Sequence, residues 1–259
     1  MRLSLMAYTF YPMLQRGVMD EFGYLETIRY RYGLRAADLW NWMLDSIDDN
    51  HARVVQRALV ERELELVGLS VSGPTVWADD LNAREYNHRN LLTHLRAAEI
   101  LGAKTVTIEA GGQYDALTYS DEQFDYFVTR YREYAQRAHD NGYRIGPENH
   151  YGPELVPAEM RHLCQAVDHP GFGMVLHTRE WIGEDAHRGT EMLAPWIIHV
   201  HLSDVPSHEK MVDTVTTLLN GGYAGAWSIE TEQGATYAQA GLMIARVRHI
   251  LEGWRHTVD

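Results

Sequence analysis

Short apolar runs alternate with longer amphipathic stretches along the whole chain, and this alternation predicts strands and helices in turn. The strand-like runs cover residues 3–10, 34–40, 66–71 and 104–109, followed by four runs that end at Glu148, His177, His201 and Glu230. The helical stretches include residues 20–32, 48–65, 84–101 and 237–254, in which apolar residues recur at helical spacing.

Eight strand-then-helix units within 259 residues predict a (β/α)8 TIM barrel that forms one domain over residues 1–259. This fold typically takes about 250 residues. A doubly wound open sheet is the main alternative, and no linker rich in Pro, Gly or Ser divides the chain.

Local signals agree with these elements at several ends. Ser120 followed by Gln123 predicts a capping box at the start of a helix, and Gly102 predicts the end of another. The fifth strand is the least regular, because Gly146 and Pro147 are unfavourable inside a strand.

Four polar residues each end one of the last four predicted strands: Glu148, His177, His201 and Glu230. Active sites of such barrels lie at the carboxyl ends of the strands, so these side chains are expected to converge at one mouth. Carboxylate and imidazole groups bind Mn²⁺, Fe²⁺, Co²⁺, Ni²⁺ or Zn²⁺. The four residues therefore predict a site for one divalent metal ion.

Each of these residues alone also has a structural interpretation, as a solvated rim carboxylate or a packed histidine. The ordered set favours metal binding, because four ligand-type residues at the same end of successive strands are unexpected by chance. His199 and His201 share one face of their strand, so only one of them is expected to bind metal, with the other beneath it or beside it.

Composition narrows the classes of partner. A formal net charge of −13 argues against nucleic acid, whose affinity for proteins depends largely on Lys and Arg. No apolar run approaches the roughly 18 residues of a membrane span, and the chain begins directly with a strand pattern. The single cysteine, Cys164, is interpreted as a buried apolar residue, and we expect a cytoplasmic protein.

The ordered motifs resemble those of the xylose-isomerase-like sugar isomerases and epimerases over nearly the whole chain. The likeness lies in four segments of sequence: Glu148-Asn-His150, Leu176-His-Thr178, His199-Val-His201-Leu-Ser-Asp204 and Gly222-Tyr-Ala-Gly-Ala-Trp-Ser-Ile-Glu230. The family includes tagatose and psicose 3-epimerases, hydroxypyruvate isomerase, and inosose isomerases and dehydratases.

The resemblance implies that Glu148, His201 and Glu230 bind the metal, with manganese expected first and Co, Fe, Ni, Zn or Mg as alternatives. The chain departs from the family at His177, where an Asp is usual, and at Arg179, because a His or Asn usually follows that Asp by two or three residues. Imidazole can replace a carboxylate as ligand, so His177 is kept as the fourth. A standard ketose substrate is therefore not assumed.

The mechanism implied by the family is proton transfer at a carbon next to a carbonyl, through an enediolate that the metal stabilises. Glu148 and Glu230 would act as base and acid in an isomerase or epimerase. A lyase of the same fold is the first alternative, either an inosose-type dehydratase or a deglycosidase that cleaves a 3-keto-glycoside by β-elimination. A metal-dependent endonuclease and a metal-free sugar-binding protein are further alternatives.

Other residues near the predicted mouth are candidates for contact with a small carbohydrate substrate: Tyr8, Trp40, Trp77, Glu109, His150 and Arg179. Trp42 also lies near a strand end, and each aromatic residue has a purely structural alternative. Asp204 is expected to orient a neighbouring ligand. The family leads us to expect a homo-oligomer, or a small second subunit under the lyase interpretation.

Overall fold

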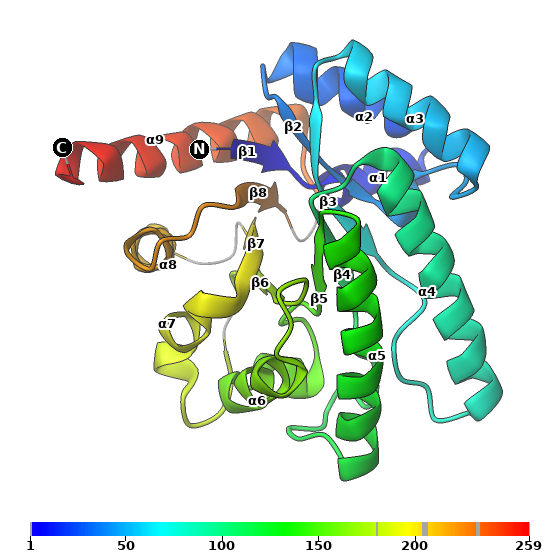
Figure 1. The fold of residues 1–259 in the computed structure, drawn as a ribbon. Helices are drawn as coiled ribbons and strands as arrows, with labels where there is room; N and C mark the ends of the chain where they lie inside the picture. Colours follow the sequence, from blue (N-terminus) through cyan, green and yellow to red (C-terminus); the bar gives the residue numbers. More distant parts are fainter. Residues whose placement is uncertain (1, 180, 204–206, 232–233, 259) are drawn as a thin grey trace.

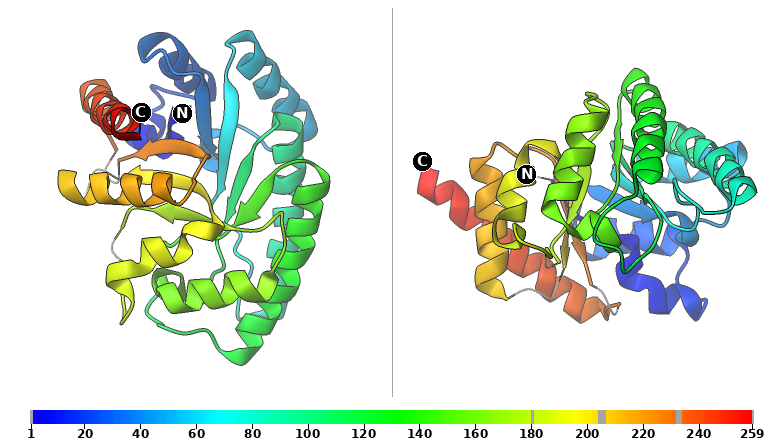
Figure 2. Two further views of the ribbon diagram at one scale, coloured as in Figure 1. Left: turned by 60° about the vertical axis from the view of Figure 1, so that its left-hand side comes forward. Right: turned by 90° about the horizontal axis from the view of Figure 1, so that it is seen from below.

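A computed structural model of the chain describes residues 2–179, 181–203, 207–231 and 234–258, without the side chains of 255–258. Eight parallel strands surround one axis (Figures 1 and 2). Their bounds are β1 Arg2–Leu5, β2 Ala36–Trp40, β3 Glu65–Val71, β4 Thr105–Ile108, β5 Arg144–Gly146, β6 Met174–His177, β7 Ile197–Ser203 and β8 Ala226–Glu230.

The strands form two four-stranded sheets, ordered β1-β8-β7-β6 and β2-β3-β4-β5. Short bridges join the sheets on both sides, Met6 with Asp38 on one and Ile145 with Phe172 and Glu148 with Val175 on the other. These bridges close the two sheets into a barrel and confirm the predicted (β/α)8 fold.

Helices cover the outside of the barrel, as both views in Figure 2 show. The longer ones are α3 Asp49–Glu61, α4 Leu81–Leu101, α5 Asp121–Asp140, α6 Pro157–Val167, α8 His208–Asn220 and α9 Tyr237–Val258; shorter ones are α1 Tyr11–Gln15, α2 Glu21–Glu26 and α7 Gly189–Leu193. Their apolar faces pack on the strands, because the strands β2, β6, β7 and β8 are buried throughout.

Several predicted details are confirmed, while some element bounds differ. The capping box between Ser120 and Gln123 is present, and Gly102 ends α4 in the left-handed conformation. Residues 7–10 form a 3-10 turn, so the prediction of strand there was wrong. Residues 27–31 form one turn of π-helix after α2.

Strand β5 contains only three residues, as its unfavourable sequence suggested. A side chain at position 146 would meet the carbonyl oxygen of Gly173 at 1.8 Å, so glycine is required where β5 approaches β6. Pro147 lacks an N–H, yet its carbonyl accepts a hydrogen bond from Val175 N at 2.8 Å. The sheet therefore continues to Glu148.

Cys164 is buried, as predicted. Within the described ranges, none of the helices combines the length and the apolar character that a bilayer crossing demands.

Candidate active site at the barrel mouth

The four predicted ligand residues lie at the carboxyl ends of neighbouring strands. Glu148 follows β5 and pairs with Val175, His177 and Glu230 are the last residues of β6 and β8, and His201 lies near the end of β7. All four are buried, although Glu148 and Glu230 still border a cavity. The barrel topology therefore brings together residues more than 80 positions apart in the sequence.

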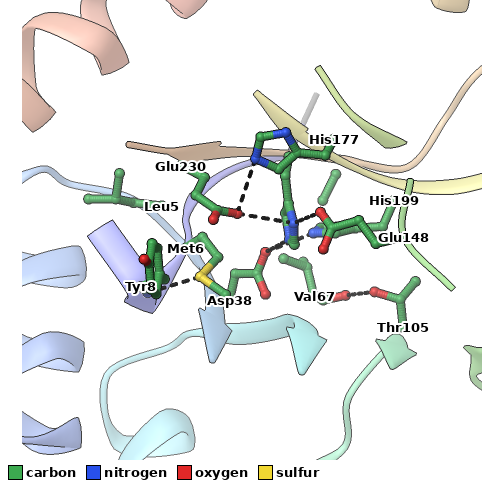
Figure 3. Close-up of polar contacts among 12 residues, drawn as sticks. Leu5, Met6, Tyr8, Asp38, Val67, Thr105, Glu148, His177, His199 and Glu230 are labelled. Carbon is green, nitrogen blue, oxygen red and sulfur yellow. Dashed lines mark hydrogen bonds and ion pairs between the residues drawn. The ribbon is translucent and has the colours of Figure 1, made fainter. Parts of the chain in front are cut away.

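His201 lies between the two glutamates, and Figure 3 shows both carboxylates pointing toward one imidazole. Its Nδ1 is 2.6 Å from Glu148 Oε1 and 3.2 Å from Glu230 Oε2. One donor atom from each residue lies within 4.8 Å of the others. This spacing suits three ligands of a single metal ion.

His177 lies at the edge of this group. Its Nε2 is 4.0 Å from Glu230 Oε2 (Figure 3). Its ring stacks on that of His150 with centroids 5.7 Å apart. The side chain is fully buried, and neither ring nitrogen has a hydrogen-bond partner among the described residues.

The backbone of His177 is held in place by a neighbouring side chain. Asn149 accepts from His177 N at 2.7 Å and donates to His177 O at 3.0 Å. These two bonds fix the end of β6 while leaving the imidazole nitrogens available to a ligand.

Asp38 is the site residue that the sequence reasoning missed. It lies in β2, fully buried, and its Oδ2 is 2.7 Å from His199 Nε2 and 3.2 Å from His201 Nε2. Residues 38, 199 and 201 form a second group whose donor atoms lie within 4.8 Å of one another. Since Asp38 faces Nε2 of His201, the other nitrogen of that ring faces the two glutamates.

Room for Asp38 comes from the neighbouring strand. A side chain at Gly68 in β3 would meet Asp38 Oδ1 at 2.3 Å. Two features of the sequence could have revealed this residue. Asp38 is a carboxylate within an otherwise apolar predicted strand, and Gly68 interrupts the next apolar strand. The structure also places His199 and His201 on one face, as the alternation of the strand predicted.

Electrostatic coupling makes the two glutamates different. Burial alone would raise the pKa of Glu148, but the charge and hydrogen bond of His201 hold it below its usual range. For Glu230 burial prevails, and its pKa is raised although His201 opposes the shift. The protein groups alone thus favour an ionised Glu148 beside a protonated Glu230.

The histidines are likewise shifted in opposite directions. Burial lowers the pKa of His177 to about 3, against the attraction of Glu148. For His201 burial also acts to lower the pKa, but the charges of Glu148 and Asp38 raise it well above its ordinary value. The ionised carboxylate of Asp38 is in turn stabilised by His199 and His201, which lower its pKa despite burial.

The donor set fits a divalent metal ion. Two carboxylates and an imidazole face one another within ligand spacing, and a fourth, fully buried imidazole lacks a hydrogen-bond partner among the described residues. Mixed oxygen and nitrogen donors favour Mn²⁺, Fe²⁺, Co²⁺, Ni²⁺ or Zn²⁺ over Ca²⁺. A bound cation would also favour the ionised form of both glutamates.

A cavity of about 390 Å³ opens from Glu148 and Glu230 toward solvent. Five of the six residues predicted to contact substrate line it: Tyr8, Trp40, Glu109, His150 and Arg179. Burial, and secondarily the charge of Glu148, raise the pKa of Glu109 to about 7. Glu109 therefore places a third carboxyl group in the cavity that Glu148 and Glu230 line.

The sixth residue that was predicted to contact substrate is placed differently. Trp77 does not line this cavity; its ring packs under the guanidinium of Arg84, whose Cζ is 3.4 Å from the ring centroid, and donates from Nε1 to Asp79. Its role in substrate contact has no support from this geometry. Asp204 lies outside the described residues.

Comparison with solved structures identifies similar barrels over nearly the whole chain. L-ribulose 3-epimerase superposes with a TM-score of 0.77 at 14% identity, covering 99% of this chain and 96% of the other. The 3-keto-D-glucoside 4-epimerase YcjR from E. coli gives 0.72 at 16% identity, with 97% and 98% covered. The probable 3-DHS dehydratase AsbF from Bacillus anthracis gives 0.65 at 18% identity, with 89% and 92% covered.

At these identities the likeness shows the fold alone, and no curated protein matches the sequence. The sequence itself matches one family over residues 30–247, most of its length. The order of strands and the converging residues at their ends agree with that match. The chain belongs to the family of xylose isomerase-like TIM barrels.

Proposed function

We propose that the barrel mouth binds one divalent metal ion and catalyses isomerisation or epimerisation of a sugar, keto-sugar or cyclitol. The proposed ligands are Glu148, His201 and Glu230, with His177 as the fourth. The observation that carries the proposal is the convergence of three donor atoms within 4.8 Å at the inner end of an open cavity. Manganese is the first candidate metal.

The metal would supply Lewis-acid stabilisation for negative charge that develops on substrate oxygens next to the reacting carbon. The chain supplies the proton transfers. Glu148 and Glu230 approach His201 from two strands, so two carboxyl groups lie at one site where they could act as base and acid on a bound substrate. We assign proton removal to Glu148 and proton return to Glu230.

The remaining residues would position the substrate and keep water away from the reacting carbon. His201 is held by Asp38 on one side, so its orientation is fixed before substrate arrives. Tyr8 and Trp40 offer aromatic surfaces suited to the apolar faces of a sugar ring, and Arg179 and His150 offer polar contacts.

Two of the three solved structures described above are named as sugar epimerases, which supports this reaction class. We also propose a cytoplasmic location, in accord with a single buried cysteine. Assembly as a homo-oligomer is part of the same proposal.

Metal content of the gently purified protein, measured by elemental mass spectrometry, is the first test. About one equivalent of Mn, Fe, Co, Ni or Zn is expected. Glu230→Gln should lose most of it, whereas Glu252→Gln, an exposed glutamate on α9, should retain it. No metal even after reconstitution would refute the proposal.

Proton transfer is tested by solvent deuterium uptake into a panel of keto-sugars. Exchange at carbon should fall by about 10²-fold or more in Glu148→Gln, which removes a general base. The Glu252→Gln protein serves again as the control. Full exchange in Glu148→Gln would refute the acid–base assignment even if the metal is present.

A lyase reaction is the second candidate, and Glu109 favours it. This carboxyl group lines the cavity beside Glu148 and has a pKa of about 7, so it can hold a proton for a departing oxygen. A similar fold occurs in a probable dehydratase. Release of a free aglycone or water from a keto-substrate, with loss of that release in Glu109→Gln, would favour the lyase; a small second subunit that co-purifies would also accord with it.

A further inference from the structure

Exposed aromatic side chains gather at the outer end of the cavity. Among the described residues, five aromatic side chains are exposed, and three of them line this one cavity: Trp42, Tyr114 and Tyr151. Trp42 is 55% exposed and Tyr114 is 65% exposed. Exposing large rings at one opening is unfavourable in water unless a ligand covers them.

Trp42 forms a fixed surface on one wall. Its Nε1 donates to Ser72 O at 3.1 Å, and its ring lies 5.1 Å from that of Trp40. Asn41 ties the same turn to Ser72 through two further hydrogen bonds, Nδ2 to Ser72 O at 3.0 Å and Ser72 N to Oδ1 at 2.9 Å. The ring is therefore held in place with one side open, which limits the entropy cost of stacking.

A second part of the cavity lining is a continuous row of rings that leads inward. Tyr114 meets Tyr151 edge to face at 4.8 Å, and Tyr151 stacks on His150 at 4.2 Å. His150 in turn stacks on His177 at 5.7 Å. The row connects the exposed rim with the proposed metal ligands.

The cavity thus has two ends of different chemistry. Charged groups that suit a hydroxylated, reacting sugar lie at the inner end, and flat rings lie at the outer end. Its volume of about 390 Å³ lies within the range of roughly 300–1,000 Å³ that accommodates ligands of drug size. A monosaccharide at the inner end would leave Trp42 and Tyr114 uncovered.

We infer that the substrate is a glycoside whose reacting sugar occupies the inner end and whose second ring stacks on Trp42 and on the Tyr114–Tyr151 pair. This inference rests on the proposed function for the location of the reacting sugar. The second ring is a flat aromatic aglycone or a second sugar, since both present an apolar face to an aromatic ring.

Calorimetric titration with unreactive probes tests the inference. The probes are methyl glucoside, para-nitrophenyl glucoside and the glucose disaccharides maltose and cellobiose, with both anomers of each glucoside. At least one two-ring probe should bind about tenfold more tightly than the methyl glucoside of the same anomer. Trp42→Ala and Tyr114→Ala should abolish this preference, whereas Tyr86→Ala, an equally exposed tyrosine on α4, should preserve it.

The outcomes distinguish an aromatic aglycone from a second sugar. They also distinguish a failure of this inference from a failure of the proposed function. Preference for the aryl probe alone assigns an aromatic aglycone, and preference for a disaccharide alone assigns a second sugar. Equal affinities, no binding by any probe, or a preference unchanged in Trp42→Ala would overturn the inference. Metal content and deuterium exchange would stand in that case, whereas their loss with a retained two-ring preference would overturn the proposed function instead.

Discussion

The substitution His177→Leu should raise stability when metal is absent and should reduce the stabilisation that metal provides. The imidazole is fully buried, and neither nitrogen has a hydrogen-bond partner among the described residues. A buried polar group without a partner costs about 1–3 kcal/mol. Leucine is similar in size and carries no polar atom, so His177→Leu should be more stable in EDTA by up to about that amount.

Metal should oppose this difference, and it reverses the order once the binding energy that the variant loses exceeds the stability that it gains in EDTA. At a free metal concentration of 100 times Kd, binding stabilises the wild-type protein by about 2.7 kcal/mol. Loss of one ligand that weakens binding tenfold removes about 1.4 kcal/mol of that gain, and a larger loss of affinity removes more. Since 1 kcal/mol shifts the melting temperature of a chain of this size by about 2–4 °C, the crossover is measurable.

Thermal unfolding at about pH 7.5, with EDTA and then with Mn²⁺, is the assay. Burial lowers the pKa of His177 to about 3 from 6.5, so the ring is neutral in both folded and unfolded chains at this pH. Below 6.5 the unfolded chain gains a proton that the folded chain does not, and the stability of the wild-type protein should fall more steeply than that of the variant.

The control is His249→Leu, at an exposed histidine on α9, which should respond to Mn²⁺ as the wild-type protein does. A large destabilisation of His177→Leu in EDTA would contradict the idea that its nitrogens lack partners. Equal metal-induced shifts in both proteins would show that His177 is no ligand, even if Glu148, His201 and Glu230 are.

Three further substitutions test the group formed by Asp38, His199 and His201, the strand β3 that packs against Asp38, and the cavity. Asp38→Asn removes the charge opposite His199 and His201, so the free energy of unfolding measured in urea should fall by about 3–5 kcal/mol. Metal affinity measured by chelator competition should weaken about 10- to 100-fold. Unchanged affinity would exclude a positioning role for Asp38. The pKa of Asp38 is depressed by folding, so its contribution is present at neutral pH and should disappear as the solution is acidified below about pH 4. Burial raises the pKa of Glu109 to about 7, so the contribution of this carboxyl group to stability should decline, by up to about 3 kcal/mol, as pH rises from about 4.5 through 7. The difference in stability between wild type and Glu109→Gln, measured by urea titration between pH 5 and 8, should change by that amount with pH. Gly68→Ala places a methyl group 2.3 Å from Asp38 Oδ1 and should lower stability by about 1–3 kcal/mol; a neutral effect would show that β3 yields easily.

The sequence predicted the barrel and the four strand-end residues because both depend on periodic patterns. Strands β6 and β8 end at His177 and Glu230 as predicted, since apolar runs give way there to polar residues. The predicted first strand was too long because residues 7–10 are as apolar as a strand. In the structure the chain turns there, and Tyr8 lines the cavity. Hydrophobic pattern alone does not distinguish a buried turn from a buried strand.

Asp38 and Trp77 show why the rest of the site was beyond such patterns. Asp38 follows two alanines in β2, and no other ligand-type residue stands beside it in the sequence. Its role depends on contacts with His199 and His201, which lie more than 160 residues away and meet Asp38 only when the barrel closes. Trp40 is the last residue of β2 and lines the cavity, whereas Trp77 lies beyond the end of β3, stacks on Arg84 and does not line the cavity. Sequence position thus fixes which end of the barrel a residue occupies, while long-range packing decides which side chains there face the same ligand.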